Sequence, residues 1–252
     1  MRRRLLISLV VLALAGAAAY SVYLIVRPRS LDIALTKYGP AARTRLAPFF
    51  KHAGLAYPPK KVQILVFKRE RRLAVWVFDS RRWRYLRDYA VLAASGHTGP
   101  KLREGDYQVP EGLYRIAYLN PSSSYHLSMK VDYPNAADLA QAALDRRKRL
   151  GGDIFIHGKD LSIGCVAIGD RGIEELFTLV ADSGVANTRV ILAPVDLRVA
   201  GAPVAQDTPL WVLRLWQSIA SALHPFPIEL ESDSSLGVEG MSKLPKVFPA
   251  KN

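Results

Sequence analysis

Hydrophobic positions divide the chain into a long uncharged N-terminal segment, a β-rich middle and a helical C-terminal part. In the middle, short runs of Val, Ile, Tyr and Trp alternate with turn residues, a pattern that is typical of strands. The runs that predict strands are residues 62–68, 73–79, 84–95, 112–119, 125–131 and 189–193. With helical segments around these runs, the pattern predicts an α+β fold that is rich in strands and has flanking helices.

Three segments outside the strands predict helices. Residues 41–52 predict a short helix, in which Pro48 is expected to cause a break or kink. Residues 136–150 predict a helix whose basic end, the run 146–149, suits the negative end of the helix dipole. Residues 209–223 predict an amphipathic helix that packs on the core or, as the alternative, lies on a membrane surface.

A further helix is expected to begin at Asp170, which is a suitable N-cap residue. Its apolar residues recur at i, i+3, i+4 and i+7 and predict one buried stripe, formed by Ile173, Leu176, Phe177 and Val180. This helix closely follows the only cysteine of the chain, so we expect it to pack beneath that residue.

The N-terminus combines three arginines at positions 2–4 with 22 uncharged residues at positions 5–26. A run of this length can cross a bilayer as one helix, and the arginines favour an orientation with the N-terminus inside. A cleaved signal peptide is the alternative, with a small-residue cleavage site at 17–19. In both cases the rest of the chain lies outside the cytoplasm.

The candidate chemistry lies in one segment. A short hydrophobic run ends at His157, and a loop containing glycine leads to Cys165. A thiol is a good nucleophile as the thiolate, and a nearby imidazole can accept its proton. In an exported protein a single cysteine has no internal disulfide partner, which favours a reactive thiol.

Small residues surround this pair in a pattern that core packing does not require. Gly158 follows the histidine, and Gly164 directly precedes the cysteine. Glycines let backbone N–H groups approach a substrate carbonyl, so the N–H groups of Gly164 and Cys165 are expected to hold an oxyanion. Ser162 is expected to orient the loop or to contact substrate.

This block resembles the catalytic motif of the L,D-transpeptidase (YkuD) family, in which His-Gly is followed by Ser-x-Gly-Cys. Residues 59–68 and 73–76 resemble the opening strands of that family, and residues within 99–114 resemble its characteristic hairpin. The resemblance covers about residues 58–193. It implies that the backbone carbonyl of Gly158 orients the imidazole of His157.

The segments His126-Leu-Ser and Tyr133-Pro-Asn135 are similar to the YafK subgroup of this family. The resemblance implies that His126, Tyr133 and Asn135 lie near the site and bind substrate, although a strand histidine and a turn also have structural uses. Two departures from many members fit the same subgroup. Ile163 stands where many members have His, and only seven residues separate His157 from Cys165.

The resemblance implies cysteine-dependent acyl transfer on peptidoglycan stem peptides, with a thioester intermediate and no cofactor. An amine acceptor gives an L,D-transpeptidase, and water gives a YafK-like hydrolase that cleaves L,D-peptide links or the link between peptidoglycan and a lipoprotein. A noncatalytic peptidoglycan-binding protein is a third alternative. The partners that follow are stem peptides, a wall-attached lipoprotein, and the inner membrane through residues 5–26, with the main domain in the periplasm.

The net charge of +13 is uneven, because residues 60–103 carry twelve Lys or Arg and three Asp or Glu. No nucleic-acid-binding motif is present, and an exported basic domain suits the carboxylates of stem peptides instead. Residues 68–72 are equally consistent with a solvated hairpin turn. The histidines, at positions 52, 97, 126, 157 and 224, form no cluster with metal-ligand spacing, so no metal site is expected.

These features predict five parts of the chain. They are an anchor or signal sequence (1–26), a connector with a short helix (27–60), the L,D-transpeptidase-like domain (61–195), the amphipathic helix region (196–230) and a loose tail (231–252).

Overall fold

The computed structural model describes residues 2–228, and for residues 2–10 and 17–29 it describes the backbone alone. The predicted tail at 231–252 lies outside the described residues. The helices are α1 (Arg2–His52), α2 (Ala136–Leu144), α3 (Gly169–Ser183) and α4 (Leu210–Leu223), with a 3₁₀ turn at Val185–Asn187. The strands are β1 (Val62–Phe67), β2 (Arg72–Phe78), β3 (Trp83–Ala90), β4 (Ala93–Ala94), β5 (Gly112–Ser123), β6 (His126–Val131), β7 (Phe155–His157), β8 (Val166–Ala167) and β9 (Thr188–Ala193).

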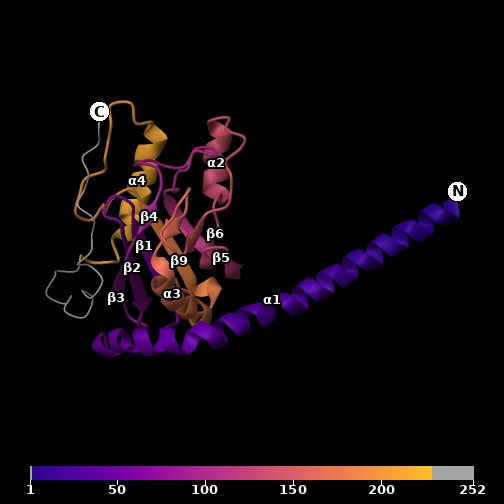
Figure 1. Cartoon of the computed structure of the whole chain (residues 1–252). Coiled ribbons are helices and arrows are strands. Elements are labelled where there is room, and N and C mark those ends of the chain that lie inside the picture. Colours follow the sequence, from indigo (N-terminus) through magenta and orange to yellow (C-terminus); the bar gives the residue numbers. More distant parts are fainter. Residues whose placement is uncertain (1, 229–252) are drawn as a thin grey trace.

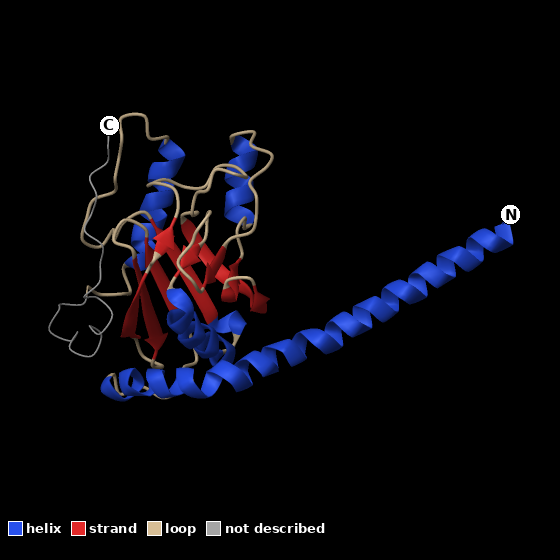
Figure 2. Cartoon of the chain, viewed as in Figure 1, coloured by secondary structure: helices blue, strands red, loops and turns tan. Residues whose placement is uncertain are grey.

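The described strands form one curled, mixed sheet in the order β3-β2-β1-β9-β5-β6-β7-β8-β4. Two neighbouring pairs, β1 with β9 and β7 with β8, are parallel, and the other pairs are antiparallel. Figure 2 shows helices at both ends and on the faces of this sheet. The predicted α+β class with flanking helices is confirmed.

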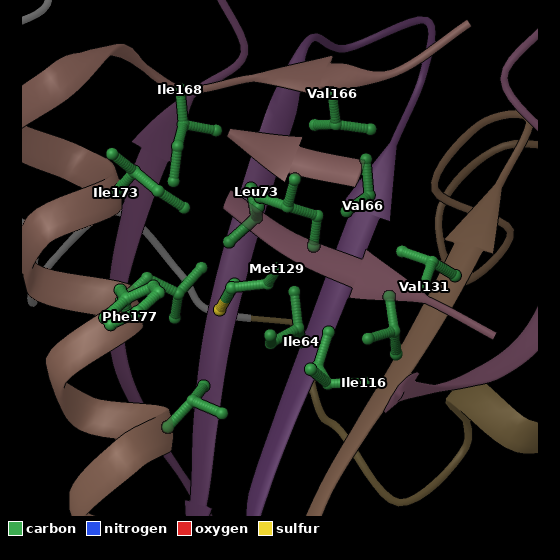
Figure 3. Close-up of a cluster of buried hydrophobic side chains, with 14 of the residues drawn as sticks. Ile64, Val66, Leu73, Ile116, Met129, Val131, Val166, Ile168, Ile173 and Phe177 are labelled. Atoms are coloured by element: carbon green, nitrogen blue, oxygen red, sulfur yellow. The ribbon is translucent and has the colours of Figure 1, made fainter. Parts of the chain in front are cut away.

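Both faces of the central strands are buried, since successive side chains point to opposite faces. In β1, Ile64 and Val66 join the cluster that packs on α3, whereas Leu65 and Phe67 join the cluster that packs on α4. Figure 3 shows the first cluster, in which Phe177 of α3 faces the sheet. The predicted stripe of α3 and the predicted helix at 209–223 are therefore confirmed as core elements.

The predicted strands are present, with two differences at their ends. Residues 84–95 form two separate strands, because β3 pairs with β2 whereas β4 leaves that edge and pairs with β8. The strand expected at 112–119 continues to Ser123, and its pairing with β6 becomes irregular between Asn120 and Ser123.

The connector predicted at residues 27–60 has a different secondary structure from the one expected. Residues 2–52 form one continuous helix, so the predicted short helix with a break at Pro48 is wrong. Leu46 and Phe50 on either side of that proline are buried against the domain. Arg45 binds Glu175 and Glu174 of α3 at 2.6 and 2.9 Å. This packing outweighs the local cost of a proline in a helix.

Figure 1 shows that the C-terminal part of α1 lies along one end of the domain, whereas its N-terminal part extends away from it. Among the residues with described side chains, no helix has the length and apolar character needed to cross a membrane. The anchor predicted at 5–26 falls mostly on residues whose side chains lie outside the described set, and it stays a prediction.

Two predicted helix ends are wrong. α2 stops at Leu144 instead of residue 150, because Asp145 caps it and Arg146 takes a left-handed conformation with φ of 56°. The basic run 146–149 therefore lies beyond the helix. Asp170 does not cap α3 but lies in its first turn, and its Oδ1 accepts the N–H of Lys159 at 2.8 Å.

The turn at 68–71 is solvated at residues 69–71, as one of the two alternatives predicted, but Lys68 is an exception. The side chain of Lys68 is only 7% exposed, and its Nζ lies 2.9 Å from Oε1 of the fully buried Glu111. Trp216 of α4 donates to the other oxygen of Glu111 at 2.7 Å. Because a buried carboxylate needs partners for both oxygens, this group ties α4 to the hairpin before β5.

Candidate active site

Strands β7 and β8 bring the predicted pair together. His157 ends β7 and lies opposite Ala167 of the parallel strand β8, two residues after Cys165. Because side chains alternate along a strand, His157 and Cys165 share one face, whereas Ile156 and Val166 point to the other face and into the core. Both reactive side chains line one cavity of about 410 Å³.

The imidazole of His157 is held in one tautomer. Its Nδ1 lies 2.6 Å from the carbonyl oxygen of Gly158, and a carbonyl can only accept, so Nδ1 carries the proton. This leaves Nε2 as the acceptor. The ring of Tyr125 packs on the imidazole with 4.7 Å between centroids. Burial lowers the pKa of His157 below its ordinary value, so the free histidine is neutral at pH 7.

The thiol of Cys165 is partly buried and protonated at rest. Its Sγ lies 3.4 Å from the backbone oxygen of Asp153. Burial raises the pKa of Cys165 above its ordinary value. The site therefore holds a neutral thiol beside a neutral base, and the thiolate has to form during the reaction rather than before it.

Ser162 organises the loop between the two residues. Its Oγ accepts the N–H of Cys165 at 3.1 Å and the N–H of Gly164 at 3.3 Å, and donates to the carbonyl of Cys165 at 2.7 Å. The expected loop-orienting role thus has a direct structural basis. The two N–H groups that the sequence assigned to an oxyanion hole are bound to Ser162 in this structure.

Close packing leaves room only for a glycine at position 158. A Cβ at this position would lie 2.6 Å from Oδ1 of Asp170 and 2.8 Å from the carbonyl oxygen of Tyr125. The N–H of Gly158 donates to the carbonyls of Tyr125 and Leu127 at 3.1 and 3.2 Å. A side chain here would displace the backbone that holds His157.

The three residues expected to bind substrate do not line the cavity. Nε2 of His126 lies 3.0 Å from Glu174 of α3, and its ring packs on Tyr38 of α1. Tyr133 is buried. Asn135 caps α2 by accepting two backbone N–H groups. All three residues make structural contacts instead. Only His126 is adjacent to the site, because the preceding residue, Tyr125, lines the cavity.

Several cavity residues were not expected from the sequence. Ser128 of β6 lies opposite His157 across the antiparallel pair, and Lys101 enters from the segment before β5. The aliphatic side chains of Leu161 and Ile163 line the cavity and are 66% and 71% exposed. Two signals could have predicted Ser128: the alternation of β6, which places Ser128 and Lys130 on one face, and its position in the segment His126-Leu-Ser.

No group of three or more His, Cys, Asp or Glu within the described part of the chain is arranged to hold a metal ion. The site consists of a thiol, an oriented imidazole and a cavity lined by both polar and apolar side chains.

Together the sheet and the pair define a cysteine–histidine site at the end of two short parallel strands. The chain belongs to the L,D-transpeptidase catalytic domain (YkuD) family, whose model matches residues 61–204. The matched region contains both reactive residues and the whole sheet.

Among curated proteins, the chain is 37% identical over 121 residues to YafK of Escherichia coli strain K12, named as a candidate L,D-transpeptidase. The match covers 47% of each protein, so the chain spans about half the length of the curated relatives it matches. Among solved structures, the helical cell shape determining protein Pgp2 of Campylobacter jejuni is 24% identical, with a TM-score of 0.46 over 56% of this chain and 50% of that one. L,D-transpeptidase 1 of Mycobacterium tuberculosis is 12% identical, with a TM-score of 0.32 over 53% of this chain and 62% of that one.

Proposed function

We propose that this protein is a cysteine-dependent acyl transferase that acts on peptidoglycan peptides through a thioester at Cys165. The observation that carries the proposal is the 2.6 Å hydrogen bond from His157 Nδ1 to Gly158, because it presents Nε2 as a base on the face that carries the thiol. Membership in the L,D-transpeptidase catalytic domain family supports peptidoglycan peptides as the substrate class.

In the first step, Nε2 of His157 takes the proton of Cys165 while Sγ attacks a peptide carbonyl next to a D-configured residue. The tetrahedral intermediate collapses, the C–N bond breaks, and the imidazolium gives its proton to the leaving amine. The acyl group stays on Cys165 as a thioester. The N–H groups of Gly164 and Cys165 hold the oxyanion if the loop 158–164 exchanges Ser162 Oγ for the substrate oxygen.

In the second step, an amine or water attacks the thioester, with His157 again accepting the proton of the attacking group. An amine acceptor gives L,D-transpeptidation. Water gives the second candidate function, a YafK-like hydrolase for L,D-peptide links or for the link between peptidoglycan and a lipoprotein. The high exposure of Leu161 and Ile163 at the cavity favours entry of water and supports this second candidate. A noncatalytic wall-binding protein would need neither an oriented imidazole nor a thiol.

The N-terminal segment is the feature that bears on where the protein acts. We propose that residues 5–26 anchor the protein in the inner membrane and that the catalytic domain faces the periplasm. A protein secreted after signal cleavage is the alternative. The 22 uncharged residues support the anchor, as does the continuous helix from Arg2 to His52, which joins this segment to the domain.

Mass spectrometry of purified muropeptides after incubation with the full chain tests the function. Crosslinked products indicate transpeptidation, whereas shortened stems or a released lipoprotein indicate hydrolysis. Cys165→Ala removes the nucleophile and is expected to give no product. His97→Gln is the matched control, because this histidine does not line the cavity and is expected to leave the products unchanged. Product formation by Cys165→Ala, or no product from the unaltered protein, would contradict the proposal.

A further inference from the structure

A second pocket adjoins the active-site cavity. It has a volume of about 240 Å³ and lies between α2 and α4, which stand side by side in Figure 1. Its lining includes Trp211 and Leu215 of α4, Gln141 of α2, and Leu150. It therefore offers both apolar and polar contacts, which suits a ligand with both characters.

The basic run 146–149 lies at this pocket. Since α2 ends at Leu144, the run forms a loop whose backbone is fixed, with Arg147 N donating to Ala142 O and Glu104 N donating to Arg149 O, each at 2.8 Å. The side chain of Arg147 turns into the pocket. It binds Asp145 at 3.1 Å, and its guanidinium lies 5.5 Å from the ring centroid of Trp211.

The other cations around the pocket are less well paired. Arg214 lines the pocket, one turn along α4 from Trp211, and is exposed. Arg103, Arg146 and Lys148 are exposed nearby in the sequence segments that border it. Within residues 2–228, these four side chains have no carboxylate partner among the ion pairs of the structure. A fixed loop with unpaired arginines is a ready site for a carboxylate, because the guanidinium fork matches carboxylate geometry.

The pocket and the catalytic cavity are neighbours with one lining residue in common. Lys101 lines both. Leu150 lines the pocket, and the next two residues, Gly151 and Gly152, line the cavity. A peptide held at Cys165 would pass Lys101 on its way to Arg214.

We propose that the pocket between α2 and α4 is a second substrate subsite, which binds a free carboxylate of the peptidoglycan peptide whose carbonyl lies at Cys165. Arg214 supplies the main cation, and the run 146–149 adds to the positive field. The lining carboxylate Asp138 disfavours a doubly charged phosphate and leaves a singly charged carboxylate as the better ligand. This inference rests on the proposed function.

The test uses the full chain with Cys165→Ala and measures binding of a stem tetrapeptide by calorimetry, with free carboxylates or with all of them amidated. Adding Arg214→Gln is expected to weaken binding of the free form about tenfold and to leave the amidated form unchanged. Arg81→Gln, an equal change of charge at an exposed arginine in the turn after β2, is the matched control and is expected to change neither. Inorganic phosphate is expected not to compete.

Three outcomes would overturn the subsite: unchanged binding in Arg214→Gln, equal weakening for both forms of the peptide, or displacement of the peptide by phosphate. Turnover by the chain with Cys165 intact separates this failure from failure of the proposed function. If the function fails, neither peptide form reacts. If only the subsite fails, the unaltered protein and the Arg214→Gln variant turn over the peptide with the same KM.

Discussion

His157 donates its Nδ1–H to the carbonyl of Gly158, its own neighbour in the chain, at 2.6 Å. This contact needs no third side chain, in contrast to sites in which a carboxylate orients the histidine. It depends instead on the backbone around Gly158, which packs on Tyr125 and on Asp170 without room for a Cβ. A backbone carbonyl thus orients the base, with the ring of Tyr125 packed on it, and burial lowers the pKa of His157.

The protonation states of the pair predict how the alkylation rate of Cys165 depends on pH. Burial raises the pKa of Cys165 and lowers that of His157, so the thiol stays protonated near neutral pH. Alkylation by iodoacetamide is expected to be slow at pH 6 and to rise about tenfold per pH unit up to pH 8 and beyond. Stopped-flow or timed-quench alkylation between pH 5 and pH 10 measures this. A rate that is already maximal below pH 7 would show a preformed thiolate instead.

A substitution at Gly158 is expected to destabilise the fold and the base together. The added methyl group of Gly158→Ala would lie within 2.8 Å of the Tyr125 carbonyl and still closer to Asp170, so the strand end must shift. We expect a loss of about 1–3 kcal/mol in the free energy of unfolding. Urea titration followed by circular dichroism measures it. Gly201→Ala is the control, because a Cβ there meets nothing within 4 Å. Equal stability of the two variants would argue against the tight packing.

The uncharged segment at residues 5–26 predicts how the protein is held in the cell. If residues 5–26 span the inner membrane, the mature protein begins near Met1 and stays in the membrane fraction after a high-salt wash, because salt releases only proteins held by charge. Fractionation and N-terminal sequencing measure both properties. A mature N-terminus near Tyr20, in a protein released from the membrane, would show cleavage and periplasmic secretion instead.

The loop 158–164 influences whether the thioester is hydrolysed by water or transferred to an amine acceptor. Its exposed side chains Leu161 and Ile163 leave the thioester less covered than a closed pocket would, so measurable hydrolysis is expected even when an amine acceptor is supplied. The test supplies a donor peptide with and without a labelled D-amino acid or diaminopimelate and quantifies both products. Complete incorporation of the acceptor with no hydrolysed product would refute the open-site argument.

The sequence was most informative where periodicity and chemistry coincide. The stripe of α3 and the pairing of His157 with Cys165 follow from local patterns, because core faces and strand ends depend on neighbouring residues. The N–H groups of Gly164 and Cys165 were assigned to an oxyanion, but the structure binds them to Ser162. A sequence shows which groups can meet, whereas competition between nearby acceptors is decided by geometry.

Long-range contacts explain the other differences. Pro48 predicts a break, yet α1 continues because Arg45 and its neighbours bind carboxylates on α3, far away in the sequence. Lys68 looks like a surface turn residue until Glu111 is placed beside it. His126 has the right residue type for substrate binding, but its partner Glu174 lies 48 residues away in the sequence, so no local pattern reveals the contact. Asn135 differs, because its partner Asp138 is three residues away and forms a capping box with it.

The central claim is a thioester between Cys165 and a peptidoglycan peptide. Its most direct test is the intact mass of the full chain, quenched with acid during turnover of a stem tetrapeptide, followed by peptide mapping. The account predicts an added mass equal to the acyl part of the donor, located on Cys165, and no adduct with Cys165→Ala. With His157→Ala, the rate of adduct formation is expected to fall ~10²–10⁴-fold, the usual contribution of a general base. Turnover without any adduct, or an adduct on another residue, would contradict the account.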